Sequence, residues 1–252
     1  MSSIVESDTG GAPSRTLKGS ARPYAGLRAA FQALSSLLSL GALLLPAVAA
    51  AECASAPPII GGDQKCVETL TVVAFGDSLT AGFAIPASQA FPAQLERRLA
   101  ADGFPVRVVN AGVSGDTTAD GLARLDYALT EKPDLVILEL GANDALRGID
   151  PATVRDNLDK MIRKIEANGA KVLLVGMLAP PNWGAEYKSD FDRIFPELAK
   201  VHDVQLYPFF LEGVAMKPEL NQPDGLHPNE HGVAVLVDRL APVVAHLVGS
   251  PS

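Results

Sequence analysis

The sequence contains 252 residues, of which 48% are hydrophobic and 20% are charged, and its formal net charge is −8 at pH 7. This composition excludes an intrinsically disordered chain, and the length suits one sizeable globular domain once any targeting segment is removed. The acidic balance also argues against a nucleic-acid partner, because binding to phosphates requires a basic surface.

The first 51 residues are predicted to be a targeting segment. Residues 1–28 are polar and basic, whereas residues 29–51 contain no charged side chain and end in a run of small residues. Small residues after an apolar stretch are typical of a signal-peptidase site, so we expect a cleaved signal peptide and a periplasmic or secreted protein. The alternative is a membrane anchor over residues 29–51, since an uncharged stretch of this length is just long enough to span a bilayer.

Residues 52–68 are expected to form an N-terminal extension, followed by a single domain over residues 69–252. The extension contains the two cysteines of the chain, Cys53 and Cys66. An exported protein permits a disulfide between them, which would pin the start of the mature chain rather than its core. Two cysteines alone do not predict a metal site.

Short apolar runs alternate with amphipathic stretches through this domain. The apolar runs predict strands at residues 72–75, 106–109, 135–140, 172–177 and 204–207. Helical periodicity and flanking Gly or Pro predict helices at residues 91–101, 117–129, 151–167, 189–201 and 229–247. Strands that alternate with helices at this spacing predict an α/β fold with a parallel sheet covered by helices on both faces.

Four connections in this pattern carry residues that suit acyl transfer. Ser78, Gly115 and Asn143 follow the first three strands, and Asp224 and His227 lie in the loop before the last helix. In a parallel sheet, such connections meet at the carboxyl edge, where ligands bind. Ser78 would be a nucleophile, His227 its general base and Asp224 the group that orients the imidazole. The backbone N–H groups of Ser78 and Gly115 and the Asn143 amide would stabilise the oxyanion.

Each of these residues also has a purely structural interpretation. Serine and asparagine cap helices, glycine serves turns, and an aspartate three residues before a histidine can form a local turn. Their occurrence together, at four strand ends in this order, favours the catalytic interpretation.

The segments that carry these residues resemble the four sequence blocks of the GDSL, or SGNH, hydrolases. The blocks are Gly76-Asp77-Ser78-Leu79, Gly115, Gly141-Ala142-Asn143-Asp144 and Asp224-Gly225-Leu226-His227. The resemblance covers roughly residues 70–240, and the chain is similar in particular to bacterial periplasmic arylesterases with thioesterase and lysophospholipase activity.

This resemblance implies a flavodoxin-like three-layer α/β/α sandwich with a central parallel sheet. It implies hydrolysis of esters or thioesters through an acyl-enzyme, with no metal or organic cofactor. It assigns catalytic roles to Ser78, Asp224 and His227. It assigns the oxyanion site to Ser78, Gly115 and Asn143.

Substrate contacts are predicted from two further segments. Asp144 and Leu146 lie in residues 143–148, which resemble the arylesterase branch of the family. Pro181 and Trp183 follow the fourth strand at the same sheet edge, so we expect them to line the acyl side of the cleft. The expected partner is a small acyl ester or thioester, with a lysophospholipid as a further candidate, and nothing in the sequence indicates an obligate protein partner.

Two other classes of protein are alternatives. Residues 227–231 match a His-x-x-Glu-His zinc pattern that would use His227 and His231 in a metal hydrolase. That motif needs both histidines on one helical face and a third ligand, whereas Pro228 places His227 at or before the start of the helix. The second alternative is an SGNH-fold binding protein without catalysis, although every catalytic position is filled.

Overall fold

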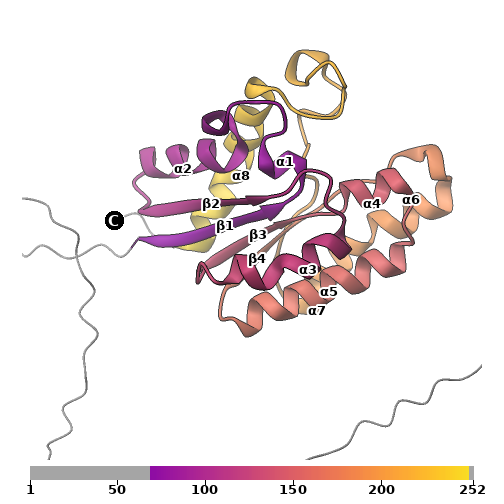
Figure 1. Ribbon diagram of the computed structural model, residues 1–252, viewed down its shortest axis with the longest axis horizontal. Helices are drawn as coiled ribbons and strands as arrows, with labels where there is room; N and C mark the ends of the chain where they lie inside the picture. The colour runs from indigo at the N-terminus through magenta and orange to yellow at the C-terminus, as the bar shows by residue number, and fades with distance from the viewer. Residues whose placement is uncertain (1–68, 250–252) are drawn as a thin grey trace, which may run out of the picture. The chain divides into compact units, whose positions relative to one another are not determined.

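The structure is a computed structural model that describes residues 69–249 (Figure 1). The expected signal peptide or anchor, the N-terminal extension and the Cys53–Cys66 pair lie outside the described residues, as do residues 250–252. The expectations for those segments therefore stay predictions.

A parallel sheet of five strands, in the order β2-β1-β3-β4-β5, forms the centre of the domain. The strands are β1 (Leu70–Gly76), β2 (Val106–Gly112), β3 (Leu135–Glu139), β4 (Lys171–Val175) and β5 (Gln205–Tyr207). β1 lies between β2 and β3, and its last residue, Gly76, pairs with Gly112 on one side and Glu139 on the other. Because the paired strands all run parallel, their carboxyl ends meet at one edge of the sheet.

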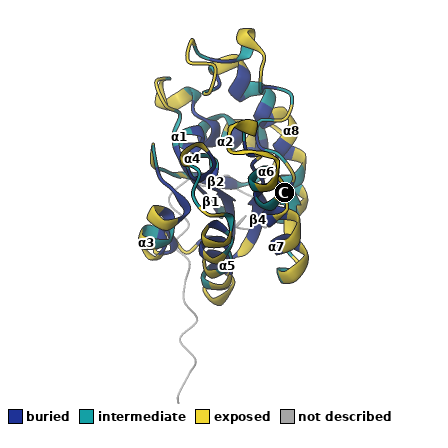
Figure 2. Cartoon of the chain, turned by 90° about the vertical axis from the view of Figure 1, so that its right-hand side faces the viewer, coloured by how far each residue is buried: buried dark blue, intermediate teal, exposed yellow. Residues whose placement is uncertain are grey.

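Helices cover both faces of the sheet, as the alternating pattern predicts. α2 (Phe91–Ala101) and α8 (Glu230–Val248) pack together on one face, and α3 (Thr118–Leu129), α5 (Pro151–Ala167) and α7 (Ile194–His202) form the opposite layer (Figure 1). The inner strands β1, β3 and β4 are mostly buried, as are the inward faces of the helices, whereas the edge strands β2 and β5 and the outward faces of the helices are partly exposed (Figure 2). The predicted α/β/α sandwich is therefore confirmed.

The last helix, α8, is long and apolar enough to cross a membrane by length and composition alone. Its buried residues include Val233, Leu236 and Leu240, which belong to the hydrophobic core of the domain. An apolar face packed against a sheet is typical of a core helix.

Two short helices at the carboxyl edge of the sheet were not predicted. α1 (Ser78–Ala81) and α4 (Ala142–Arg147) follow β1 and β3 almost directly. The Asp77 side chain caps α1 by accepting the N–H of Leu79 at 3.0 Å. These helices hold Ser78 and Asn143 on regular backbone, close to the strand ends that lead to them.

The helix predicted at residues 189–201 is instead two helices, α6 (Ala185–Asp192) and α7, which meet at Arg193. Pro196 explains the break, because proline has no N–H to donate to the carbonyl of residue 192 and its ring crowds the preceding turn. The remaining short elements are the 3-10 helices η1 (Ala87–Gln89), η2 (Pro181–Trp183) and η3 (Pro218–Leu220).

Candidate active site

A serine, a histidine and an aspartate form a hydrogen-bonded chain at the carboxyl edge of the sheet. Ser78 begins α1, and Asp224 and His227 lie in the connection between β5 and α8. Ser78 Oγ is 2.9 Å from His227 Nε2, and His227 Nδ1 is 2.7 Å from Asp224 Oδ2. With a proton on Nδ1, the imidazole donates to Asp224 and accepts from Ser78. A histidine in this arrangement acts as a general base toward the serine hydroxyl.

The Asp224 carboxylate is held by the backbone of its own loop. Its Oδ1 accepts the N–H groups of Leu226 at 2.9 Å and His227 at 3.0 Å. The pKa of Asp224 is lowered to about 2. The largest cause is the hydrogen bond from the His227 backbone, and the bonds from the His227 side chain and the Leu226 backbone add to it. An ionised, fixed carboxylate keeps the imidazole in the tautomer that the serine needs. On its other side, the imidazole packs against Phe83, with 4.6 Å between the ring centroids.

Ser78, Gly115 and Asn143 border the same cleft as His227. Gly115 has a φ of +89°, in the left-handed region that glycine adopts without strain. Within residues 69–249, the backbone N–H groups of Ser78 and Gly115 donate to no protein acceptor. Backbone donors that are fixed and unengaged in this way suit a developing oxyanion.

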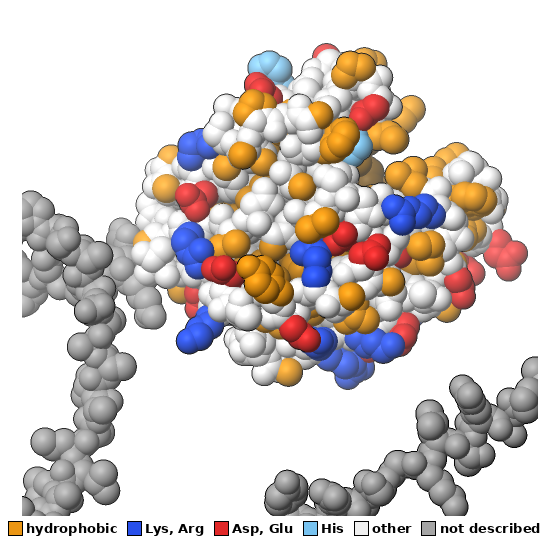
Figure 3. Space-filling model, in the orientation of Figure 1, with side chains coloured by type: hydrophobic (Ala, Val, Ile, Leu, Met, Phe, Trp, Pro, Cys, Tyr) orange, Lys and Arg blue, Asp and Glu red, His pale blue; other side chains and the backbone are white. Residues whose placement is uncertain are grey.

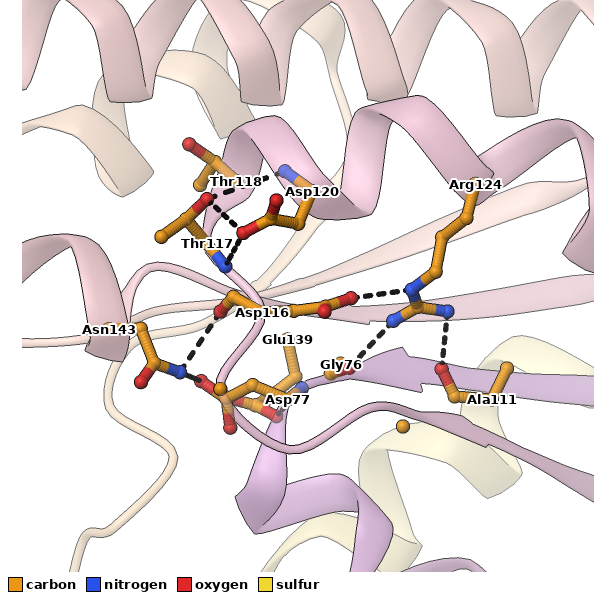
Figure 4. Close-up of polar contacts among 12 residues, drawn as sticks. Gly76, Asp77, Ala111, Asp116, Thr117, Thr118, Asp120, Arg124, Glu139 and Asn143 are labelled. Carbon is orange, nitrogen blue, oxygen red and sulfur yellow. Dashed lines mark hydrogen bonds and ion pairs between the residues drawn. The ribbon is translucent and has the colours of Figure 1, made fainter.

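The Asn143 amide differs from these two donors because it already has protein acceptors. Its Nδ2 donates to the Asp116 carbonyl at 2.9 Å and to Asp77 Oδ2 at 3.1 Å (Figure 4). An oxyanion in the cleft would therefore have to share or replace one of these bonds, and the longer bond to Asp77 is the weaker competitor.

Two buried carboxyl groups, Asp77 and Glu139, lie beside the nucleophile turn. Glu139 Oε2 accepts the Thr80 hydroxyl at 2.7 Å and the Asp77 N–H at 3.4 Å. Burial raises the pKa of Asp77 to about 6. Burial also raises the pKa of Glu139 well above its usual range, and repulsion from Asp77 adds to that effect. The turn that begins with Ser78 is therefore hydrogen-bonded to Glu139, a carboxyl group that favours its neutral form.

The cleft beside Ser78 has a volume of about 510 Å³. Figure 3 shows a hollow in the surface with hydrophobic side chains gathered on both sides. Besides the site residues, its walls are Leu79, Phe83, Ser114, Ala142, Ala145, Leu146, Met177, Leu178, Ala179, Pro180, Phe209, Leu211 and Leu226. An apolar cleft of this size with a few convergent polar groups suits a small ligand that carries an apolar moiety.

Of the four residues predicted to contact substrate, Leu146 lines this cleft, whereas Asp144 does not. The Asp144 side chain is buried and accepts the N–H of Thr118 at 2.8 Å and its hydroxyl at 2.7 Å. Asp144 therefore joins the start of α4 to the start of α3. These bonds hold the segment that carries Asn143.

Pro181 and Trp183 lie in η2 and are not among the residues that line the cleft, so their predicted contact with substrate stays a prediction. The Trp183 indole N–H donates to the Ala145 carbonyl at 2.9 Å, and its ring packs so closely on Gly148 that a Cβ there would come within 2.8 Å. Through these two contacts, Trp183 stabilises α4 and the residue that ends it. Residues 177–180 form the cleft wall that was assigned to it.

One residue of this network was missed by sequence analysis. Arg124 of α3 pairs with Asp116, whose carbonyl receives the Asn143 amide (Figure 4). Arg124 belongs to none of the four sequence blocks. Arg124 lies three residues after the buried Gly121 and one before the buried Leu125, on the inward face of an amphipathic helix. A charged residue on such a face is the signal that could have revealed it.

The geometry does not support the zinc alternative. α8 begins at Glu230 with Asn229 as its N-cap, so His227 precedes the helix and does not share a helical face with His231. Both ring nitrogens of His227 are within hydrogen-bond distance of Ser78 and Asp224. A metal ligand must offer one of them as a free lone pair.

The fold and the site together define the class of this protein. A serine directly after the first strand of a parallel α/β/α sheet, hydrogen-bonded to a histidine that pairs with an aspartate from the last connection, is the arrangement of an SGNH-type serine hydrolase. Comparison with known proteins identifies the family within this class. The model of the GDSL-like lipase/acylhydrolase family matches residues 74–235.

Similar proteins of known name agree with this match. The chain is 44% identical over 178 residues to an arylesterase of Vibrio mimicus, covering 70% of this chain and 89% of the relative. It is 40% identical over 183 residues to thioesterase 1/protease 1/lysophospholipase L1 of Escherichia coli (strain K12), covering 72% and 86%. Its fold is similar to the crystal structure of TesA, with a TM-score of 0.66 and 46% identity, covering 71% of this chain and 99% of that one.

The chain belongs to the GDSL-like lipase/acylhydrolase family and is a carboxylic ester hydrolase. The resemblance that the sequence blocks indicated is therefore confirmed.

Proposed function

We propose that the enzyme hydrolyses carboxylic esters and thioesters through an acyl-enzyme on Ser78. The observation that carries this proposal is the Ser78–His227–Asp224 hydrogen-bond chain, with distances of 2.9 and 2.7 Å, at the edge of an apolar cleft. Covalent catalysis by serine needs such a neighbouring base, itself oriented by a third group. The catalytic roles of these residues, and of Gly115 and Asn143, are part of the proposal.

In the first half-reaction, Ser78 Oγ attacks the acyl carbon while His227 Nε2 takes its proton. The carbonyl oxygen becomes an oxyanion, which the N–H groups of Ser78 and Gly115 and the Asn143 amide stabilise. His227 then gives the proton to the departing alcohol or thiol, which leaves an ester of Ser78. In the second half-reaction, water attacks that ester, His227 takes the water proton, and the carboxylic acid departs as Ser78 recovers its proton.

The substrate class follows from the walls of the cleft. Side chains such as Phe83, Leu146, Leu178 and Leu226 offer apolar contact but no charge to a bound group. We therefore assign small acyl and aryl esters as preferred substrates, and acyl thioesters and lysophospholipids as further candidates. The names of the relatives, an arylesterase and a thioesterase/lysophospholipase, support this range.

The test of the mechanism is covalent labelling followed by kinetics. A fluorophosphonate should label the wild-type protein once, and Ser78→Ala should abolish both the labelling and the hydrolysis of p-nitrophenyl esters. The exposed Ser114→Ala is the matched control, because Ser114 lines the cleft but makes no contact with His227. Retained hydrolysis in Ser78→Ala, or hydrolysis lost with EDTA and restored by zinc, would contradict the serine mechanism. An acyl chain-length series assayed beside a lysophospholipid would rank the substrates.

We also propose that residues 1–51 are a signal peptide and that the enzyme works in the periplasm or outside the cell. The support is the small-residue run that follows the uncharged stretch of residues 29–51. N-terminal sequencing of protein from the soluble periplasmic fraction should find a start between about residues 49 and 54. Recovery only from membranes, with residues 29–51 intact, would favour the anchor.

A further inference from the structure

Arg124 makes an unusual set of bonds for an arginine near the surface of a helix. Its side chain is 25% exposed, and its guanidinium carbon lies 4.1 Å from the centroid of the Phe75 ring. Nη1 donates to the Ala111 carbonyl of β2 and Nη2 to the Gly76 carbonyl of β1, each at 2.9 Å. Nε donates to Asp116 Oδ2 at 2.5 Å. One planar group therefore holds two strand ends and a carboxylate, as Figure 4 shows.

Asp116 connects this arginine to the oxyanion site. Its carboxylate accepts from Arg124, while its carbonyl accepts the Asn143 amide at 2.9 Å. Asp116 also directly follows Gly115, the second oxyanion residue. Arg124 itself does not line the cleft. Arg124 therefore reaches the site only through its partners, which include the Gly76 carbonyl two residues before Ser78 as well as Asp116. Of these partners, Asp116 is the one that accepts the Asn143 amide.

Removal of the guanidinium would leave the Asp116 carboxylate, whose side chain is only 11% exposed, without its cation. A desolvated carboxylate that loses its partner is strongly unfavourable, and the loop would move to bring it to water. That movement would carry the Asp116 carbonyl away from Asn143. Lysine cannot substitute fully, because its single ammonium lacks the flat fork of an arginine that meets three acceptors at once.

We propose that Arg124 is a positioning residue of the oxyanion site, which holds Asp116 so that its carbonyl keeps the Asn143 amide directed at the cleft. The inference rests on the proposed serine-esterase mechanism in which Asn143 stabilises the oxyanion. A residue that only supported the fold would act independently of Asn143. A residue that works through Asn143 would lose its effect once that amide is gone.

The test is a double-mutant cycle in which Arg124→Met and Asp116→Ala are each made in the wild type and in Asn143→Ala. In the wild type, each substitution should lower kcat for a p-nitrophenyl ester by about 10-fold or more with little change in KM, since the lost contact belongs to the transition state. In the Asn143→Ala background, each should lower kcat by less than about 3-fold. Arg124→Lys should give an intermediate loss. If each substitution lowers kcat by the same factor in the wild type and in Asn143→Ala, the proposal is overturned.

A second measurement does not depend on activity. The Nδ2 resonances of Asn143 are identified by their absence from spectra of Asn143→Ala, and they should shift in Arg124→Met and in Asp116→Ala. Unchanged resonances would overturn the proposal even if kcat falls. If the wild type hydrolyses no ester, the proposed function fails, and these resonances alone decide the positioning role. If Arg124→Met does not fold, Asp116→Ala carries both measurements.

The matched control is Arg155→Met, which removes an arginine ion pair with Glu197 between α5 and α7. This substitution should leave both kcat and the Asn143 resonances unchanged. A similar loss of kcat in Arg155→Met would show that any missing helix ion pair slows the enzyme, and the specific role of Arg124 would then be excluded.

Discussion

Asn143 and Glu139 show what individual side chains contribute at the site. Asn143 reaches the cleft from the second position of α4 and is held by two acceptors. Glu139 ends β3 and is held by Thr80 and Asp77, but one of its oxygens, Oε1, is buried with no partner among the described residues. Asn143 therefore offers an amide to the cleft, which suits the oxyanion role proposed for it. Glu139 lies where burial makes a negative charge unfavourable.

We expect Asn143→Ala to lower kcat by about 10²–10³-fold while KM changes little, the magnitude found when one oxyanion donor is removed from other hydrolases. The reason is that the amide bonds the tetrahedral oxygen better than the planar carbonyl. Steady-state kinetics on an activated aryl ester measures this effect, with thermal melts of the same proteins. Asn182→Ala, an exposed asparagine of η2 outside the cleft, is the control. A retained kcat with a lower melting temperature would show that Asn143 is only structural.

Glu139→Gln should make the stability of the protein less dependent on pH. Burial raises the pKa of Glu139 well above its ordinary value of 4.5, so above pH 4.5 the folded state keeps a proton that the unfolded state has lost. Stability therefore falls as the pH rises from about 4.5 toward the folded pKa. Asp77, with a pKa raised from 3.8 to about 6, acts with the same sign between those values. Asp224 acts with the opposite sign, but only between about 2 and 3.8.

Glutamine cannot ionise, so it removes the contribution of residue 139 to the pH dependence. The melting temperature of the wild type should thus fall between pH 5 and pH 8, and that of Glu139→Gln should fall less. Glu131→Gln, at an exposed ion pair with Arg107, should follow the wild type. Parallel pH profiles for wild type and Glu139→Gln would mean that Glu139 is ionised in the folded protein.

At the scale of single elements, the helices with clear end signals were predicted best. α2 and α5 have the predicted bounds, since a proline lies in the first turn of each and Asp102-Gly103 or Asn168-Gly169 follows. The short α4 was missed because Gly141, at a φ of +120°, starts it without a side-chain cap and six residues are too few to show periodicity. The positions of Asp144, Pro181 and Trp183 outside the cleft walls could not be predicted for a related reason. Sequence places a residue at a sheet edge but does not give the direction of its side chain.

α4 also separates structural support from substrate contact. Trp183 bonds the Ala145 carbonyl and packs on Gly148 behind this helix, whereas Leu146 faces the cleft. We expect Trp183→Ala to lower stability by about 1–3 kcal/mol, since it removes a hydrogen bond and part of a packed ring. Its kcat/KM should fall by the same factor for every acyl chain length.

Leu146→Ala should instead change the preference among chain lengths, with little loss of stability, because the Leu146 side chain is half exposed in the cleft wall. A series of p-nitrophenyl esters from acetate upward, with melts of each protein, measures both effects. A changed chain-length preference in Trp183→Ala would return Trp183 to the substrate site.

At the scale of the whole molecule, the proximity of Ser78, His227 and Asp224 could be predicted because topology brings their connections together. Ser78 and His227 are 149 residues apart in sequence, yet parallel strands bring their connections to one edge. Arg124 and Glu139 could not be given roles in this way, because their partners are backbone carbonyls and buried side chains. Such contacts are defined only by the register of the strands and the orientation of the helix against the sheet. The sequence thus indicates which residues react, and the structure shows which residues hold them.

The same topology predicts that the domain works without the residues ahead of it. The residues that line the cleft lie between Ser78 and His227, and the buried core of the described range runs from Val72 to Val244. We therefore expect a protein that starts at Glu52 to match the full chain in kcat, KM and melting temperature. Steady-state kinetics and differential scanning calorimetry of the two proteins, purified from the soluble fraction, make the comparison. Cys66→Ser in the shorter protein tests whether a Cys53–Cys66 disulfide adds stability. A lower melting temperature for the shorter protein, at equal kcat, would show that residues 1–51 stabilise the domain, which contradicts their assignment as a cleaved signal peptide.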